Sequence, residues 1–344
     1  MHDAGVMPER LGRFLSARDG TRTAVVRRYE AMVGGYSRVM ARAEVAWSDG
    51  SVEMVVLRGD PPAGKAMIET DRDVEHALLH ALTSSGSVAM PAVRAYDSSG
   101  AELGTKCIVL DHVDGQSLQA LLNATPIEQH GEHALDLVDT LASIHALDVD
   151  ALDLPIPRPT SWDDYLGELI DRFRQADRGH AESVPFLRYV ASWLDAHRPP
   201  PLPLRLVHSD FQAANIMVER GGRHLMIDWE LAHVGDPRED LGYYNVYSSA
   251  SGPNLFARDP EAFLARYRQR TGFDEQAVNL TTMGYFSSLA AITVYAQVLH
   301  GAGALARGTN AGLLTTYTMN ALTIGHSNFL AGCTAPQSQS TAVA

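Results

Sequence analysis

Stretches rich in Val, Met and aromatic residues dominate the first third of the chain, and this pattern of apolar positions predicts β-strands. The turn sequences Gly34-Gly35 and Ser48-Asp49-Gly50 separate the first three stretches. Two shorter stretches of the same kind follow. We therefore expect five strands, at Thr23–Val33, Ser37–Trp47, Val52–Arg58, Ala92–Tyr96 and Lys106–Asp111.

The apolar spacing becomes helical between the third and fourth predicted strands, over Met67–Leu82. Five strands with one helix inserted after the third predict a small α+β lobe. Beyond this lobe the chain is mainly helical. We expect helices at Gln116–Asn123, at Ile127–Leu147 after the helix-start signal Thr125-Pro126, and from Glu261 towards the end.

The change from strands to helices predicts a boundary near Val113-Asp114-Gly115. A chain of 344 residues is long enough for two packed lobes. We expect an N-terminal, nucleotide-binding lobe over Met1–Val113 and a C-terminal lobe over Asp114–Leu330 that carries the catalytic and acceptor-binding residues. The tail Ala331–Ala344 is rich in Ser, Gln, Thr and Ala and is expected to be disordered.

Composition limits the kinds of partner. Apolar residues make up 45% of the chain and charged residues 20%, as in ordinary soluble globular proteins. The N-terminus lacks the basic and apolar stretches of a signal peptide, and two cysteines suggest no disulfide framework, so we expect a cytoplasmic protein. The net charge of −13 argues against nucleic acid or an anionic membrane as a partner, because either would need a basic face.

Most of this negative charge falls in the predicted C-terminal lobe, with 26 acidic and 15 basic residues from Asp114 to the end. Two interpretations are open: the acidity keeps this lobe soluble, or it lines a groove that attracts a cationic substrate. Only the second interpretation predicts a preference for a positively charged small molecule.

The strongest candidate for chemistry is the set Asp210, Asn215 and Asp228. The apolar pair Leu206-Val207 leads into the loop that carries the first Asp, and two short strands joined by Gly221-Gly222 lead from the Asn to the second Asp. A hairpin of that length brings its two ends together, so Asn215 and Asp228 would offer oxygen ligands to one Mg²⁺. Asp210 would accept the proton of a substrate hydroxyl. Turn and capping roles alone explain three such residues at this spacing poorly.

These residues resemble the aminoglycoside phosphotransferase and choline kinase superfamily, whose catalytic loop reads H-x-D-x-x-x-x-N and whose metal-binding Asp lies in I-D-[WF]. The matching residues are His208, Asp210, Asn215 and Ile227-Asp228-Trp229, and residues 235–241 match the family's G-D-P-x-x-D-L segment. The resemblance implies a bilobal protein-kinase-like fold, with ATP and Mg²⁺ as cofactors. It also implies that Asp240 braces the catalytic loop and that His208 packs beneath it.

The chain is most similar to the kinase-like branch that also occurs fused to certain acyl-CoA dehydrogenases, over about Leu11 to Leu330. The branch motifs G-G-x-S-N, V-L-R-x-x-P-P and M-E-x-V-x-G correspond to residues 34–38, 56–62 and 110–115. This resemblance identifies the segments of the N-terminal lobe that would hold the nucleotide.

Two of these segments would contact the nucleotide through the backbone. Gly34 and Gly35 let the main chain approach phosphates, and Ser37 adds a hydroxyl donor, unless the glycine pair is only a hairpin turn. The resemblance implies that the backbone of Asp111 and Val113 hydrogen-bonds the adenine.

Arg58 ends the third predicted strand, where kinase-like folds place a cation on the α- and β-phosphates. Its guanidinium fork can also pair with a carboxylate of the following helix. We expect that carboxylate to be Glu75, on the inward side of the helix, with Asp71 as its rival. Ordinary surface positions are the alternative for both side chains. The apolar residues that define the inward side are Leu78, Leu79 and Leu82.

Two residues depart from the family pattern, since Ser209 stands where Gly is usual and Arg38 where Asn is usual. Ser209 adds a side chain beside the expected catalytic base, and Arg38 either reaches a phosphate or points into solvent. These departures motivate a second hypothesis, a nucleotide-binding, kinase-like protein with little or no turnover.

The acceptor is expected to be a hydroxyl of a small molecule. Asp240 follows Asp228 by only twelve positions, which leaves no room for the longer segment on which a protein kinase holds a peptide. The acidity favours an aminoglycoside-like cation, whereas the branch fused to acyl-CoA dehydrogenases favours a hydroxyacyl thioester. The aromatic residues that would line the acceptor pocket, unless they are core residues, are Trp162, Tyr165, Tyr243, Tyr244, Tyr247 and Tyr285.

Overall fold

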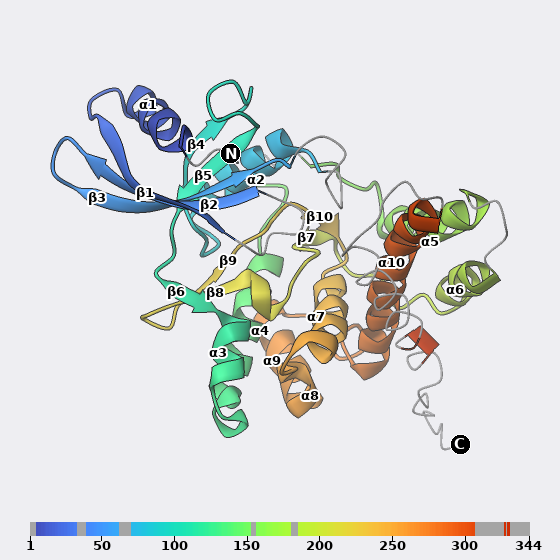
Figure 1. The fold of residues 1–344 in the computed structure, drawn as a ribbon. Helices are drawn as coiled ribbons and strands as arrows, with labels where there is room; N and C mark the ends of the chain where they lie inside the picture. The colour runs from blue at the N-terminus through green and yellow to red at the C-terminus, as the bar shows by residue number, and fades with distance from the viewer. Residues whose placement is uncertain are drawn as a thin grey trace, which may run out of the picture. The chain divides into compact units, whose positions relative to one another are not determined.

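A computed structural model describes residues 5–32, 39–61, 70–152, 156–179, 185–306, 327 and 329–330 (Figure 1). Two compact units make up the chain. The first unit comprises Met1–Ser117, Asp150–Ile156 and Ile216–Leu231, and the second comprises Leu118–Val149, Pro157–Asn215 and Ala232–Ala344. The division of the chain near Val113-Asp114-Gly115 stays a prediction, and the tail Ala331–Ala344 lies outside the described residues.

A five-stranded antiparallel sheet forms the centre of the first unit, in the spatial order β1-β2-β3-β5-β4. All five predicted strands are present, with ends within a few residues of those expected. The strands are β1 (Ala24–Met32), β2 (Val39–Trp47), β3 (Val52–Gly59), β4 (Val93–Asp97) and β5 (Cys107–Asp111).

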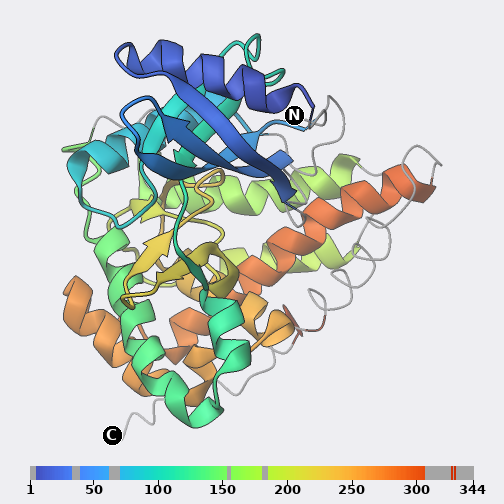
Figure 2. The same ribbon diagram turned by 60° about the vertical axis from the view of Figure 1, so that its left-hand side comes forward.

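A helix that we did not predict, α1 (Met7–Asp19), precedes the sheet and packs against it (Figure 2). It buries one face in the core of the first unit, in a hydrophobic cluster that also includes Val45, Leu57 and Val109 of the sheet. The buried residues on this face of the helix are Met7, Leu11, Phe14 and Leu15.

Helix α2 (Arg72–Ser85) lies between β3 and β4, as predicted, but begins five residues later than expected. Asp71 has extended backbone angles, and its carboxylate accepts hydrogen bonds from the amides of Asp73 and Val74. This is the geometry of an N-cap, which fixes the start of the helix. Asp71 is therefore a capping residue and is excluded as the rival of Glu75.

A second, three-stranded sheet in the first unit joins β6 (Gly115–Ser117), β8 (Ile216–Glu219) and β9 (His224–Met226) in that order. The predicted hairpin is confirmed. The helix predicted over Gln116–Asn123 is wrong at its start, because Gln116 and Ser117 pair with β8 about a hundred residues later. Gly115 approaches Val218 so closely that a Cβ would lie 2.1 Å from its carbonyl oxygen.

The second unit is mainly helical and contains one short antiparallel strand pair, β7 (Arg205–Val207) with β10 (His233–Gly235). Helices α5 (Trp162–Gly179), α6 (Pro185–Ala196) and α10 (Leu280–Ala306) share one core, which includes Leu166, Leu194 and Phe286. The helix predicted over Ile127–Leu147 is divided into a 3₁₀ turn (Ile127–Gln129) and α4 (His130–His145). The α-helices of this unit are α3 (Leu118–Ala124), α4 (His130–His145), α5 (Trp162–Gly179), α6 (Pro185–Ala196), α7 (Arg238–Ser251), α8 (Leu255–Arg258), α9 (Pro260–Thr271) and α10 (Leu280–Ala306).

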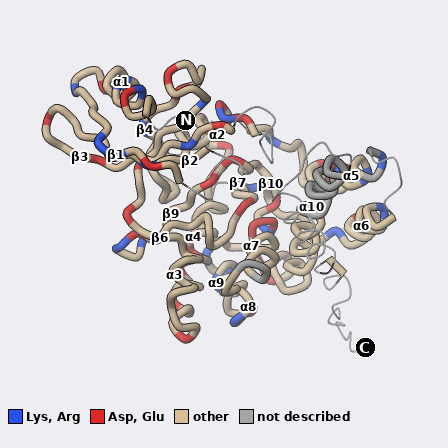
Figure 3. Tube along the Cα trace, in the orientation of Figure 1, with Lys and Arg blue, Asp and Glu red and all other residues tan. Residues whose placement is uncertain are grey.

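Among the described residues, none of the helices combines the length and the apolar character needed to span a bilayer. Acidic and basic positions occur along the elements of both units (Figure 3).

Candidate active site

The loop that follows β7 carries His208, Ser209 and Asp210, and Asp240 of α7 holds its backbone. The buried carboxylate of Asp240 accepts the amide hydrogens of His208 and Ser209, both at 2.8 Å. His208 itself is fully buried. The bracing role expected for Asp240 and the packing expected for His208 are therefore both present.

His145 of α4 extends this brace, a role that sequence reasoning missed. Its Nε2 lies 3.1 Å from Oδ2 of Asp240, and its Nδ1 lies 2.6 Å from the hydroxyl of Tyr267. Burial raises the pKa of Asp240, but the hydrogen bond and charge of His145 and the amide of His208 outweigh it, so the pKa is lowered overall. Asp240 is therefore held as a charged acceptor.

The backbone conformation of Ser209 explains why glycine is usual at this position in the superfamily that the chain resembles. Ser209 has φ of +64°, in the left-handed region that favours glycine. The serine adopts this conformation while its amide bonds Asp240. The departure from the family pattern therefore leaves the brace of the loop intact.

Three side chains of the second unit donate hydrogen bonds to the carboxylate of Asp210. Tyr243 Oη and Gln212 Nε2 donate to Oδ1 at 2.6 and 2.7 Å, and Asn215 Nδ2 donates to Oδ2 at 2.6 Å. Asn215 ends a short 3₁₀ turn, and its side-chain amide also reaches the carbonyl of Asp210 at 3.0 Å. Because the NH₂ group of Asn215 donates to Asp210, the side-chain amide oxygen of Asn215 is the atom that would ligate a metal.

In the first unit, Arg58 of β3 lies among three carboxylates. Its Nη1 lies 3.3 Å from Oε1 of Glu75, and its Nη2 lies 3.1 Å from Oε2 of Glu230 and also contacts Asp228. Burial by itself lowers the pKa of Arg58, but the charges of Asp228, Glu75 and Glu230 outweigh it and raise the pKa overall. The ion pair expected between Arg58 and Glu75 is present, and Arg58 is buried rather than a surface cation.

Two members of this network were missed from the sequence, Arg72 and Glu230. The fully buried Arg72 contacts Glu75 and lies 3.0 Å from Asp60. Glu230 is the last residue of the segment Ile227-Asp228-Trp229-Glu230, so its place close to Asp228, the expected metal ligand, was the signal available. Asp228 itself has φ of +68°, which turns the chain sharply after β9.

The model of the phosphotransferase enzyme family matches residues 17–280, about three quarters of the chain. The chain belongs to this family.

Similar proteins agree with this assignment. Acyl-CoA dehydrogenase family member 11 of Rattus norvegicus is 28% identical over 198 residues, which are 56% of this phosphotransferase-family chain and 25% of the rat protein. A candidate aminoglycoside phosphotransferase of Ralstonia eutropha JMP134 superposes with a TM-score of 0.71 at 16% identity, covering 96% of this chain and 99% of its own. The complex of APH(2″)-IIIa with GDP and kanamycin superposes with a TM-score of 0.61 at 17% identity, covering 92% and 98%. The predicted protein-kinase-like α+β fold is confirmed.

The remaining residues predicted to bind the nucleotide lie either at or just after the end of β5, or outside the described residues. The amide of Asp111 donates to the carbonyl of Ala92 at 2.9 Å, and the carboxylate of Asp111 contacts Arg94. Val113 follows two residues after Asp111. The expected phosphate-binding residues Gly34, Gly35 and Ser37 lie outside the described residues.

Most aromatic residues proposed to line the acceptor pocket are core residues. Those that are buried are Trp162, Tyr165, Tyr244 and Tyr285. Tyr243 and Tyr247 differ, since both are only partly buried and their rings stack 4.0 Å apart. Tyr243 reaches Asp210, so it is the member of the set that contacts the expected catalytic base.

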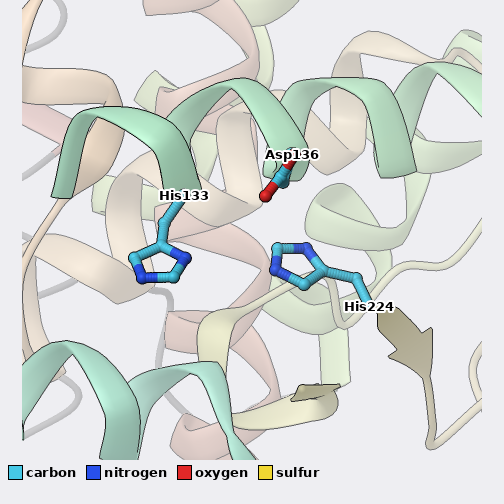
Figure 4. A group of neighbouring side chains, drawn as sticks. All are labelled: His133, Asp136 and His224. Carbon is cyan, nitrogen blue, oxygen red and sulfur yellow. The ribbon is translucent and has the colours of Figure 1, made fainter. Parts of the chain in front are cut away.

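Figure 4 shows three further side chains that are able to ligate a metal. His133 and Asp136 lie one turn apart on α4 of the second unit, and His224 extends from β9 of the first unit. The α4 pair by itself supplies two ligands, fewer than a protein metal centre normally uses.

Proposed function

We propose that this phosphotransferase-family chain transfers the γ-phosphoryl group of ATP to a hydroxyl of a small molecule in a Mg²⁺-dependent reaction. The observation that carries the proposal is the braced loop on which Asp210 is held by Tyr243, Gln212 and Asn215. A carboxylate held in this way can accept a proton from an alcohol without first reorienting.

In the proposed reaction the acceptor hydroxyl donates its hydrogen bond to Asp210. As the acceptor oxygen bonds to the γ-phosphorus, its proton moves to the carboxylate, the bond to the β–γ bridging oxygen breaks, and the electron pair leaves on ADP. Asp240 keeps the loop still during transfer through the amides of His208 and Ser209.

Asn215 and Asp228 are the proposed ligands of Mg²⁺, on the basis of their spacing along the chain. A carboxylate and an amide oxygen suit this hard cation, so the donor set fits the metal. When bound, Mg²⁺ would neutralise charge on the phosphates of the nucleotide.

The nucleotide is proposed to lie on the first unit. Arg58, paired with Glu75, would bind its phosphates together with Gly34, Gly35 and Ser37. Because the amide of Asp111 is already donated to Ala92, the adenine would use the carbonyl of Asp111 and the amide of Val113. The GDP bound to APH(2″)-IIIa supports a nucleotide at this fold.

The short segment between Asp228 and Asp240 supports a small-molecule acceptor, since β10 and the first turn of α7 occupy it. Two acceptor classes are proposed. The kanamycin bound to APH(2″)-IIIa and the acidity of the chain favour an aminoglycoside-like cation, whereas the similarity to acyl-CoA dehydrogenase family member 11 favours a hydroxyacyl thioester.

A second candidate function, nucleotide binding with little turnover, rests on Ser209 and Arg38, of which Arg38 lies outside the described residues. The intact hydrogen bond of the Ser209 amide to Asp240 weighs against this candidate.

A mass-shift screen tests the proposal. The chain is incubated with ATP and Mg²⁺ and with panels of hydroxylated antibiotics and hydroxyacyl thioesters, and products are searched for the mass of one added phosphoryl group. We expect one class to gain this mass, and the Asp210→Asn variant to lose the product. ATP binding without any phosphorylated product would favour the second candidate.

A further inference from the structure

The guanidinium of Arg58 contacts the carboxylates that a metal beside the nucleotide would use. One nitrogen, Nη2, pairs with both Asp228 and Glu230, and the other, Nη1, pairs with Glu75. The side chains of Arg58 and Glu230 are each only 7% exposed. The side chain of Asp228 is more exposed, at 29%, but the buried guanidinium still limits how far water screens both contacts.

Arg58 remains positively charged at any physiological pH, because the guanidinium of an arginine side chain does not lose its proton in proteins. Loss of a proton therefore cannot release Asp228. A competing anion can, because phosphate oxygens accept two parallel hydrogen bonds from a guanidinium as readily as a carboxylate does.

Glu75 would keep a cationic partner if Arg58 moved to a phosphate. Arg72 contacts Glu75 and is itself anchored to Asp60 at 3.0 Å. Both Arg72 and Glu75 are almost fully buried. If Arg58 shifts, the buried carboxylate of Glu75 therefore still has the positive charge of Arg72 beside it.

We propose that Arg58 pairs with Asp228 and Glu230 when nucleotide is absent and moves to the phosphates when a nucleotide binds. Free metal therefore binds weakly to Asp228, and metal and nucleotide bind together. This inference rests on the proposed roles of Asp228 as metal ligand and Arg58 as phosphate ligand. It goes beyond them, because it makes Arg58 a competitor of the metal when nucleotide is absent.

The test is a titration of the full chain with Mn²⁺, without nucleotide or acceptor, followed by electron paramagnetic resonance of the unbound ion. In Arg58→Met the affinity for Mn²⁺ should rise about tenfold or more, since a positive charge a few ångströms from a divalent ion is removed. Calorimetry should show weaker binding of ATP to the same variant. The factor by which ATP strengthens Mn²⁺ binding should fall. By thermodynamic linkage, the factor by which Mn²⁺ strengthens ATP binding should fall equally.

Arg42→Met is the matched control. Arg42 lies on β2 of the same sheet and pairs with Glu30 at the surface, so the variant loses the same charge away from Asp228. Its Mn²⁺ affinity should equal that of the wild type. The double variant Arg58→Met/Asp228→Asn should lose the gain, which locates the gained site at Asp228.

Arg58→Lys serves if Arg58→Met does not fold. A lysine keeps the charge but cannot contact two carboxylates as a fork, so its Mn²⁺ affinity should lie between wild type and the methionine variant. A folded Arg58→Met or Arg58→Lys with unchanged or weaker Mn²⁺ affinity overturns the inference. Because no acceptor is present, failure of the phosphoryl-transfer screen would remove the proposed function without touching this result.

Discussion

Tyr243 donates a 2.6 Å hydrogen bond from its phenol to Oδ1 of Asp210, while Asn215 donates to the other carboxylate oxygen. Burial first, and then the neighbouring Tyr247 and Asp210, raise the pKa of Tyr243 well above its ordinary value. The phenol therefore remains a donor throughout the neutral range. Its ring is held by stacking on Tyr247, so the hydrogen bond is preorganised.

Tyr243→Phe should lower kcat about tenfold with little change in the KM for ATP, because one hydrogen bond to a charged group is lost. The acid limb of the kcat/KM profile should move to higher pH, since that bond favours the charged carboxylate. Tyr244→Phe is the control, because Tyr244 bonds the amide of Leu255 instead of Asp210. An unchanged pH profile in Tyr243→Phe would leave the tyrosine with a packing role only.

Asp210→Asn should preserve the fold and the affinity for ATP with Mg²⁺ but lower turnover by roughly 10² or more, because the general base is lost. Calorimetry and steady-state kinetics measure the two effects separately. Near-normal turnover would remove Asp210 from the role proposed for it.

The left-handed backbone at Ser209 predicts an order of stability among variants. Ser209→Gly should be at least as stable as the wild type, whereas the β-branched Ser209→Val should lose about 1–2 kcal/mol, because a branched side chain is strained at positive φ. Urea unfolding measures both variants. Equal stability of the glycine and valine variants would contradict the backbone strain assigned to this position.

The adjacent carboxyl groups Asp240 and Glu239 should contribute to stability with opposite dependence on pH. The pKa of Asp240 is lowered in the folded state, so its contribution is present above the ordinary value of 3.8 and is lost as the pH falls through the lowered value. Asp240→Asn should therefore cost more stability at pH 7 than below pH 3.8.

Burial, and then the charge of Asp240, raise the pKa of Glu239 well above 4.5. The folded state therefore binds a proton that the unfolded state has released, and the fold loses stability as the pH rises above 4.5. Glu239→Gln should raise stability near pH 7, and this gain should vanish below pH 4.5. Urea midpoints across pH 3–8 check both residues, and parallel curves for the two variants would contradict the assigned shifts.

Salt should separate the two acceptor classes. Raising the ionic strength from about 0.05 to 0.5 M shortens the screening length from roughly 14 to 4 Å. If the acidity of the chain attracts a cationic acceptor, its KM should rise several-fold while the KM for ATP changes less. A hydroxyacyl thioester that carries phosphates would be repelled by the same field, so its KM should fall. A KM independent of salt would reduce the acidity to a solvated surface.

Local patterns in the sequence determined the elements that depend on neighbouring residues. The five strands, the hairpin of β8 and β9 and the position of Asp210 follow from apolar runs, turn residues and motif spacing. The pairing of Arg58 with Glu75 was expected from the resemblance to kinase-like folds, and the spacing of apolar residues identified Glu75 as lying on the inward side of the helix.

The tertiary structure alone decided the contacts between distant segments. Gln116 joins β6 because β8 offers it a partner, although its own neighbours favour helix. Glu230 and Arg72 complete the surroundings of Arg58, and Tyr243 and His145 reach Asp210 and Asp240, through packing that no periodicity records. Spacing along a chain specifies which face of an element a side chain occupies, whereas its partner depends on which elements the hydrophobic core brings against that face.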